Sequence, residues 1–254
     1  MPSASDHLLA AAAALAAGGV NALAGGGTLI TFPALVATGI SAKVANVTNT
    51  VALCPGYFGG TWAQRGDLGA QRHRIPRFAA AGGLGGIAGS ALLLATSEAV
   101  FKKLVPFLIL GAVALMIFQD RLKPKKTTAA AEATPPGPGE LVAVFFVAMY
   151  GGYFGAGLGI MTIALVGILI DDSFTRLNAL KQGLSFVVNV CAAAFLSFSG
   201  HVQWSLAGVM AGAALAGGVL GGKLAGRLPP KKLRLVVIAF GLIMGVTYLY
   251  RAYL

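Results

Sequence analysis

Long apolar stretches, separated by short polar ones, run through most of the chain. About twenty mostly apolar residues are enough for a helix to cross a bilayer. Six stretches have that length, at about residues 46–64, 76–97, 100–119, 178–199, 203–226 and 232–253. The pattern therefore predicts an all-α integral membrane protein.

Two further apolar stretches, residues 8–40 and 141–170, are too long for one straight crossing. Each contains a glycine cluster, at residues 25–28 in the first and 155–159 in the second. Glycine costs a helix about 1 kcal/mol relative to alanine, so a helix is expected to unwind at such a cluster. We therefore expect each stretch to form a broken or re-entrant segment.

The chain repeats itself at an offset of about 132 positions. Equivalent residues include Gly27 and Gly159, Asn46 and Asn178, and Gly89 and Gly221. We expect an N-terminal repeat over residues 1–119 and a C-terminal repeat over 140–254, each of about four segments, joined by a flexible linker over 120–139. Duplicated halves with helices broken at corresponding positions are typical of secondary transporters, whose site lies near the bilayer midplane. A duplicated helical bundle without a transport role is the alternative.

Composition and charge support the membrane assignment and suggest an orientation. The chain is 57% hydrophobic and 11% charged, with a net charge of +11. Because the basic residues lie between apolar segments, they indicate contact with lipid headgroups rather than with nucleic acid. If the broken stretches are re-entrant, only Lys43, Lys102, Lys103 and Arg251 lie on the side opposite the linker. The positive-inside rule then predicts inverted repeats in a bacterial plasma membrane, with a cytoplasmic linker and both termini outside. If each stretch is one crossing, the charges show no bias.

No carboxylate or histidine lies within the predicted segments, since every Asp, Glu and His falls at or beyond a segment end. Proton relays, metal or cofactor sites and catalytic centres usually need such residues, so we expect none of them. An anion is the better substrate, because backbone N–H groups at the N-terminus of a broken helix bind negative charge. The residues placed to do so are Gly26, Gly27, Thr28, Gly157, Gly159 and Ile160.

Polar side chains gather early in the segment that follows each broken stretch. They are Asn46, Thr48, Asn49 and Thr50 in the first half, and Asn178, Lys181 and Gln182 in the second. The spacing i, i+3, i+4 places three residues of each half on one helix face, and such groups are costly in a membrane unless they are paired. Lys181 is the only basic residue among them, and it either binds the anion or extends to the nearby interface.

One run resembles the glycine-rich signature of the TauE/SafE sulfite exporter family. It reads Gly25-Gly26-Gly27-Thr28-Leu29-Ile30-Thr31-Phe32-Pro33-Ala34-Leu35, followed by Gly39 and by Ala45-Asn46-Val47-Thr48-Asn49. The second half is similar more loosely, with Leu165 in place of Pro33 and Lys181-Gln182 in place of Asn49-Thr50. The resemblance covers nearly the whole chain. It implies a bacterial permease for sulfite or a related organosulfonate, and the family's substrates also include thiosulfate.

These features together predict a membrane transporter, not an enzyme, that exports a small sulfur-containing anion under the membrane potential without an intramembrane proton relay. The expected substrate-binding residues are Gly26, Gly27, Thr28, Asn46, Thr48, Asn49, Thr50, Gly157, Gly159, Ile160, Asn178, Lys181 and Gln182. Membrane lipid and a second copy of the chain are the further partners we consider. Import of a sulfur anion for assimilation, and an intramembrane enzyme or assembly factor, are the alternatives.

Overall fold

The chain folds into helices, as the apolar pattern predicts. A computed structural model describes residues 2–23, 25–69, 71–118, 136–170, 172–224 and 230–253, the side chains of 230–234 excepted. No strand occurs among these residues. The helices are α1 (Ala4–Leu23), α2 (Thr28–Ala37), α3 (Ala42–Ala63), α4 (Arg65–Gly69), α5 (Ile75–Ala95), α6 (Glu98–Phe118), α7 (Pro138–Tyr153), α8 (Leu158–Leu169), α9 (Phe174–Ser197), α10 (Trp204–Leu224) and α11 (Pro230–Tyr253).

Six of the described helices are long and apolar enough to cross a bilayer. They are α1, α5, α6, α9, α10 and the Leu235–Tyr253 part of α11. This set confirms a multi-pass membrane protein. α3 has the necessary length but is not among the six, because its first half contains several amide and hydroxyl side chains, Asn46 and Asn49 included.

The two helices that carry the polar clusters begin four residues earlier than their apolar stretches. α3 begins at Ala42 and α9 at Phe174. A serine caps each start: Ser41 Oγ accepts a hydrogen bond from Val44 N, and Ser173 Oγ accepts one from Arg176 N, each at 3.4 Å. Such caps satisfy a backbone N–H that the first turn leaves unpaired. The polar clusters therefore begin in the second turn of each helix.

Both long apolar stretches break at their glycine clusters. α1 ends at Leu23 and α2 begins at Thr28, while α7 ends at Tyr153 and α8 begins at Leu158. In the breaks, Gly25 and Gly26 have φ of 76° and 97°, and Gly155 and Gly157 have φ of 77° and 76°. Only glycine adopts this left-handed region without a steric penalty, which explains why the chain turns at these residues.

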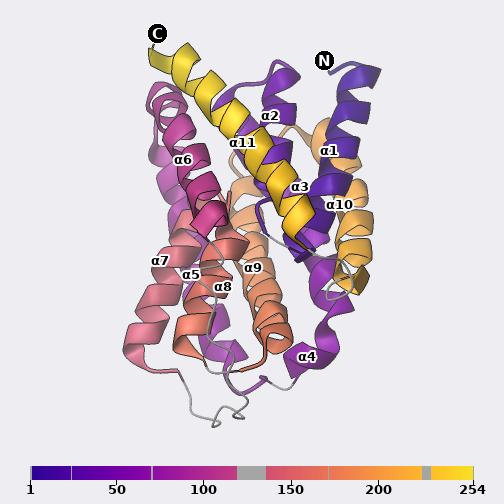
Figure 1. Cartoon of the computed structure of the whole chain (residues 1–254). Helices are drawn as coiled ribbons and strands as arrows, with labels where there is room; N and C mark the ends of the chain where they lie inside the picture. The colour runs from indigo at the N-terminus through magenta and orange to yellow at the C-terminus, as the bar shows by residue number, and fades with distance from the viewer. Residues whose placement is uncertain are drawn as a thin grey trace.

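The chain path places the two breaks inside the molecule (Figure 1). α1 runs from the end that carries both termini toward the middle, and α2 returns toward that end. α7 runs inward from the opposite end, where α4 lies, and α8 returns toward that end. α3 and α9 run between the two ends and pack against each other. The helix pairs α1–α2 and α7–α8 therefore enter the molecule from opposite ends.

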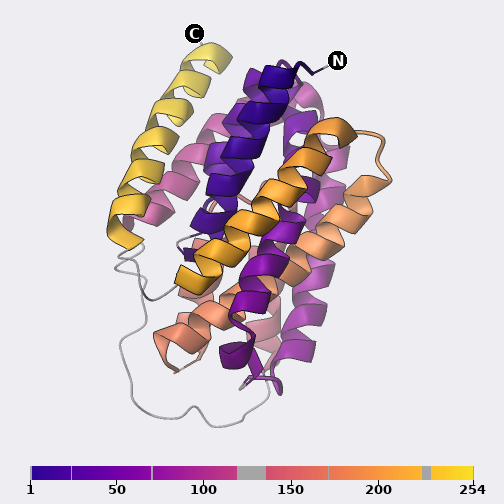
Figure 2. The same ribbon diagram turned by 90° about the vertical axis from the view of Figure 1, so that its right-hand side faces the viewer.

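Glycines allow the helices around this centre to approach closely. Gly152 of α7 faces the backbone of Gly86 in α5, and Gly218 of α10 faces the backbone of Gly56 in α3, so that a Cβ at either position would collide with main-chain atoms. α11 packs mainly on α6, at one side of the molecule (Figure 2).

The repeat boundaries stay a prediction. Of the expected linker, residues 120–135 lie outside the described part of the chain, and α7 begins at Pro138.

Candidate functional site

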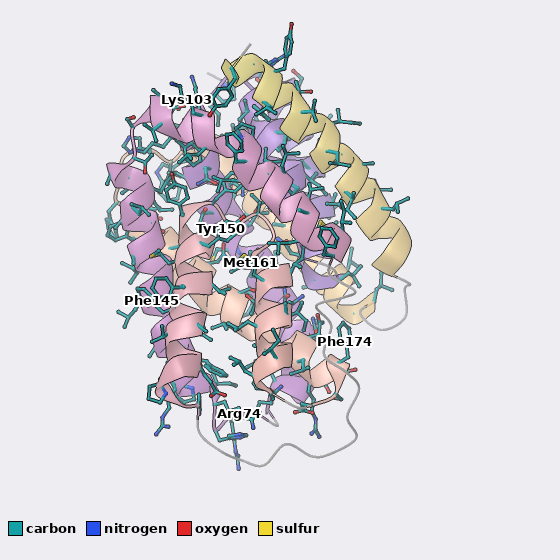
Figure 3. The ribbon with its side chains drawn as sticks, turned by 60° about the vertical axis from the view of Figure 1, so that its left-hand side comes forward. Arg74, Lys103, Phe145, Tyr150, Met161 and Phe174 are labelled. Carbon is teal, nitrogen blue, oxygen red and sulfur yellow. The ribbon has the colours of Figure 1, made fainter. Side chains whose placement is uncertain are left out.

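The two helix breaks touch each other at the centre of the fold. A Cβ added to Gly25 would lie 3.1 Å from Gly159 Cα and 3.1 Å from Ile160 N. One added to Gly155 would lie 3.9 Å from Thr28 Oγ1. Figure 3 shows the depth of this region: Tyr150 of α7 and Met161 of α8 lie between Lys103, near one end of the molecule, and Arg74, near the other. The N-termini of α2 and α8 thus meet midway along the molecule.

Some backbone N–H groups at the breaks are free and others are already bound. Within the described residues, Gly26, Gly157 and Gly159 have no acceptor for their N–H groups. Gly27 N donates to Asn21 Oδ1 at 2.7 Å, and Ile160 N donates to Gly157 O at 2.9 Å. Free N–H groups at two facing helix N-termini give the centre a positive potential.

One hydrogen bond from each half of the chain reaches the broken helix of the other half. Asn46 Nδ2 of α3 donates to Tyr153 O, at the end of α7, at 2.8 Å. Lys181 Nζ of α9 donates to Asn21 O, near the end of α1, at 3.3 Å. Both acceptors are carbonyls in the last turn of a helix, where no partner within the helix is left for them. The polar clusters of α3 and α9 therefore reach the two breaks.

Lys181 is buried beside the breaks and does not extend to the interface. Its side chain is 2% exposed, and its Cδ lies 3.6 Å from the Cβ position of Gly159. None of the described carboxylates forms an ion pair with it. A buried cation is costly unless it is paired, so an anion is the partner that this environment lacks.

Buried amide groups of α3 and α9 also have unused hydrogen-bonding capacity. Asn46 Oδ1, Asn49 Oδ1 and both amide atoms of Gln182 have no partner among the described residues. Asn49 Nδ2 lies 3.3 Å from Thr28 Oγ1. Because a hydroxyl can donate as well as accept, the Asn49 amide can turn over and present its N–H groups to a ligand. The centre thus offers a cation, backbone N–H groups and adjustable amides, which is an anion-binding set.

The comparisons with known proteins agree with this geometry. A family model described as sulfite exporter TauE/SafE matches residues 10–248. The chain belongs to the TauE/SafE family. It is therefore a multi-pass membrane transporter, and its broken helices and polar centre are features of a TauE/SafE chain.

Curated relatives of this TauE/SafE chain carry transporter names. A probable membrane transporter protein of Haemophilus influenzae is 27% identical over 91% of this chain and 89% of the relative. The probable membrane transporter protein ORF9 of a Sinorhizobium species is 31% identical over 79% and 76%. The probable membrane transporter protein YfcA of Escherichia coli K12 is 25% identical over 93% and 87%. No solved structure matches this chain.

Three of the expected binding residues make hydrogen bonds within the TauE/SafE fold. Thr48 Oγ1 accepts a hydrogen bond from Gln203 N, just before α10, at 3.0 Å. Asn178 Nδ2 donates to Gln64 Oε1 at 2.6 Å, and Thr50 Oγ1 donates to Asn46 O at 3.1 Å. Spacing along a helix defines a face, but it does not say which neighbour each position meets.

Asn21 is a central residue that the sequence analysis did not select. Its side chain binds Gly27 N and its carbonyl accepts from Lys181, so it contacts both the break and the buried cation. It is 4% exposed. The available signal was that Asn21 is the one amide in an alanine-rich run just before the glycine cluster.

Three cavities in the described part of the chain lie away from Lys181. A cavity of about 590 Å³ lies between α1, α2 and α11, and one of about 480 Å³, lined by Lys102 and Arg251, lies near the ends of α2, α6 and α11. A smaller cavity of about 120 Å³ lies beside Thr61. None of these three is lined by Lys181, which is itself 2% exposed.

Proposed function

We propose that the protein exports a small sulfur-containing anion, sulfite or an organosulfonate, by binding it between the two helix breaks. The observation that carries this proposal is Lys181: a buried cation at the meeting point of two helix N-termini, without a carboxylate partner among the described residues. An oxyanion there would take the ammonium group and the free N–H groups of Gly26 and Gly159 as donors.

The two repeats are proposed to be inverted with respect to each other. Their packing supports this: α1 lies against α10 as α7 lies against α5, and α3 lies against α10 as α9 lies against α5. With the positive-inside rule, this arrangement corresponds to a bacterial plasma-membrane protein whose linker is cytoplasmic and whose termini are outside. Alternating access would then require one repeat to move against the other around the fixed centre.

Membrane potential is the proposed driving force. An inside-negative potential favours anion exit by about 2.3 kcal/mol per charge for each 100 mV. The described carboxylates lie in first turns or loops, for example Glu98 at the start of α6 and Glu140 at the start of α7, and not beside Lys181. The proposed exporter therefore needs no proton relay through the centre.

Efflux from sealed vesicles tests this function. Vesicles containing the purified protein are loaded with labelled sulfite, thiosulfate, methanesulfonate, sulfate or chloride, and an inside-negative potential is imposed with potassium and valinomycin. We expect protein-dependent loss of sulfite or methanesulfonate that grows with the potential, because the potential acts on the moving charge. Empty vesicles are the control. Absence of protein-dependent flux for every anion would overturn the proposal. Loss of flux on collapsing a proton gradient at constant potential would overturn its driving force.

A further inference from the structure

A line of buried polar residues continues from the helix breaks along the interface of α3 and α9. On α9, Gln182, Ser185 and Asn189 are spaced to share one helix face. Their side chains are 0%, 0% and 8% exposed. We call these three residues, with Tyr57 and Thr61 of α3, the α3–α9 seam. It lies between two helices that belong to different halves of the chain.

Contacts between α3 and α9 define the seam. The Gln182 amide lies against Gly60, where a Cβ would collide with it. Thr61 Oγ1 donates to Gln182 O at 3.2 Å, and Tyr57 lies close to Asn189. The antiparallel helices thus pair their polar positions across the interface. Beyond Gln182, the bond between Asn178 and Gln64 closes the seam at the α4 end of the molecule.

Several buried polar groups of the seam have no hydrogen-bond partner among the described residues. Both amide atoms of Gln182 and Ser185 Oγ have no hydrogen-bond partner among the described residues. An unpaired polar group in a buried position costs about 1–3 kcal/mol. An interface that only held two helices together would be more stable with apolar side chains of the same shape, so these polar groups point to a ligand that passes them.

We propose that the α3–α9 seam is the route by which the anion travels between the α4 end and the helix breaks. This inference rests on the proposed function and adds a path to its binding site. Coming from the α4 end, the anion would exchange its hydration for the Thr61 hydroxyl and the Gln182 amide, which is level with Lys181 on α9. The Ser185 hydroxyl, one turn farther along α9, would extend this polar surface. Movement of one repeat against the other opens the seam, because its two walls belong to different repeats.

Cysteine accessibility tests the route in the full-length protein. The two natural cysteines, Cys54 and Cys191, are first replaced by alanine, and the flux of methanesulfonate through this parent is measured. Ser185→Cys is then treated with a membrane-impermeant maleimide, applied separately to each side of oriented vesicles. Val188→Cys is the matched control, because Val188 is on the same helix and 1% exposed but packs on Gly82 and Gly86 of α5. Thr61→Cys repeats the test from α3.

We expect Ser185→Cys to react about tenfold faster than Val188→Cys, because only a thiolate exposed to water reacts. The reaction should occur from the α4 side, slow down with saturating methanesulfonate, and block methanesulfonate flux. Two results would overturn the route while the function stands: a transporting Ser185→Cys and Thr61→Cys that do not react, or labelled variants whose flux equals that of the parent. A wild-type protein without flux of any anion would instead overturn the function, and the route with it.

Discussion

Lys181 is the residue on which the proposed chemistry depends. A lysine at bilayer depth costs about 2.5–3.5 kcal/mol on insertion scales. Its hydrogen bond to Asn21 O, at 3.3 Å, is long and goes to a neutral acceptor. A methionine of similar length would therefore contribute about as much to folding as Lys181 does. It would not carry the positive charge that binds an anion.

Replacing Lys181 by methionine should separate binding from folding. We expect Lys181→Met to bind sulfite or methanesulfonate about ten- to a hundredfold more weakly, since a hydrogen bond to a charged group is worth about 1.5–3 kcal/mol. Its melting temperature in detergent should stay the same or rise, because the variant no longer buries a charge. Lys223→Met, at an exposed position on α10, is the control and should leave both quantities unchanged. Wild-type affinity in Lys181→Met would remove Lys181 from the site.

At the scale of the elements, glycine contacts decide how closely the helices around the centre pack. Gly86 and Gly152 bring α5 and α7 into main-chain contact, and Gly56 and Gly218 do the same for α3 and α10. In a bilayer, helices gain little from the hydrophobic effect, so close van der Waals packing is a main source of association. These contacts hold α3 against α10, and Gly86 also lies against Val188 of α9, so both polar helices are closely packed.

Gly86→Leu should therefore destabilise the fold, by about 2–3 kcal/mol or more, because the side chain must displace backbone atoms of Val188 in α9. Thermal unfolding of the purified variants measures the effect. The matched control is Gly111→Leu in α6, where no atom lies within 4 Å of the Cβ position. Gly111→Leu should be neutral or slightly stabilising, since leucine favours a helix more than glycine does. Equal losses for both variants would show that the glycines act through helix propensity and not through packing.

For the whole molecule, orientation follows from the chain path and the charges together. The loop that contains His201 lies at the end that carries both termini, opposite the end of α4 (Figure 1). If the positive-inside rule sets the orientation, that end faces outward.

Labelling of spheroplasts tests this orientation. In the cysteine-free parent, His201→Cys should react with an impermeant maleimide on intact spheroplasts. Thr128→Cys, in the expected linker, should react only after permeabilisation. Leu184→Cys, which is buried in an apolar cluster, serves as the negative control. The reverse pattern would invert the proposed topology and with it the proposed direction of export under the membrane potential.

Much of the fold could be predicted from local sequence features. The apolar stretches correspond to helices because length and hydropathy alone decide what can cross a bilayer. The breaks fall at the glycine clusters because residues such as Gly25 and Gly157 adopt φ angles that other residues avoid. The starts of α3 and α9 were missed, since Ser41 and Ser173 extend these helices beyond their apolar stretches by capping them.

The site was predictable in its residue types but not in its contacts. The spacing of Asn46, Asn49 and Lys181 placed them on buried helix faces, and the structure buries all three. It did not show that Thr48 meets Gln203 or that Asn178 meets Gln64, since these partners lie far apart in the sequence.

The sequence by itself determined that this protein is a helical membrane protein with two glycine breaks and no carboxylate in its predicted segments. These properties depend on local composition and backbone preference, which act within a few residues. Only the tertiary structure brought Gly25 against Gly159, placed Lys181 beside Asn21, and aligned Gln182 with Gly60. Those contacts depend on how helices distant in the chain pack, and packing is decided by the shapes of all the helices at once.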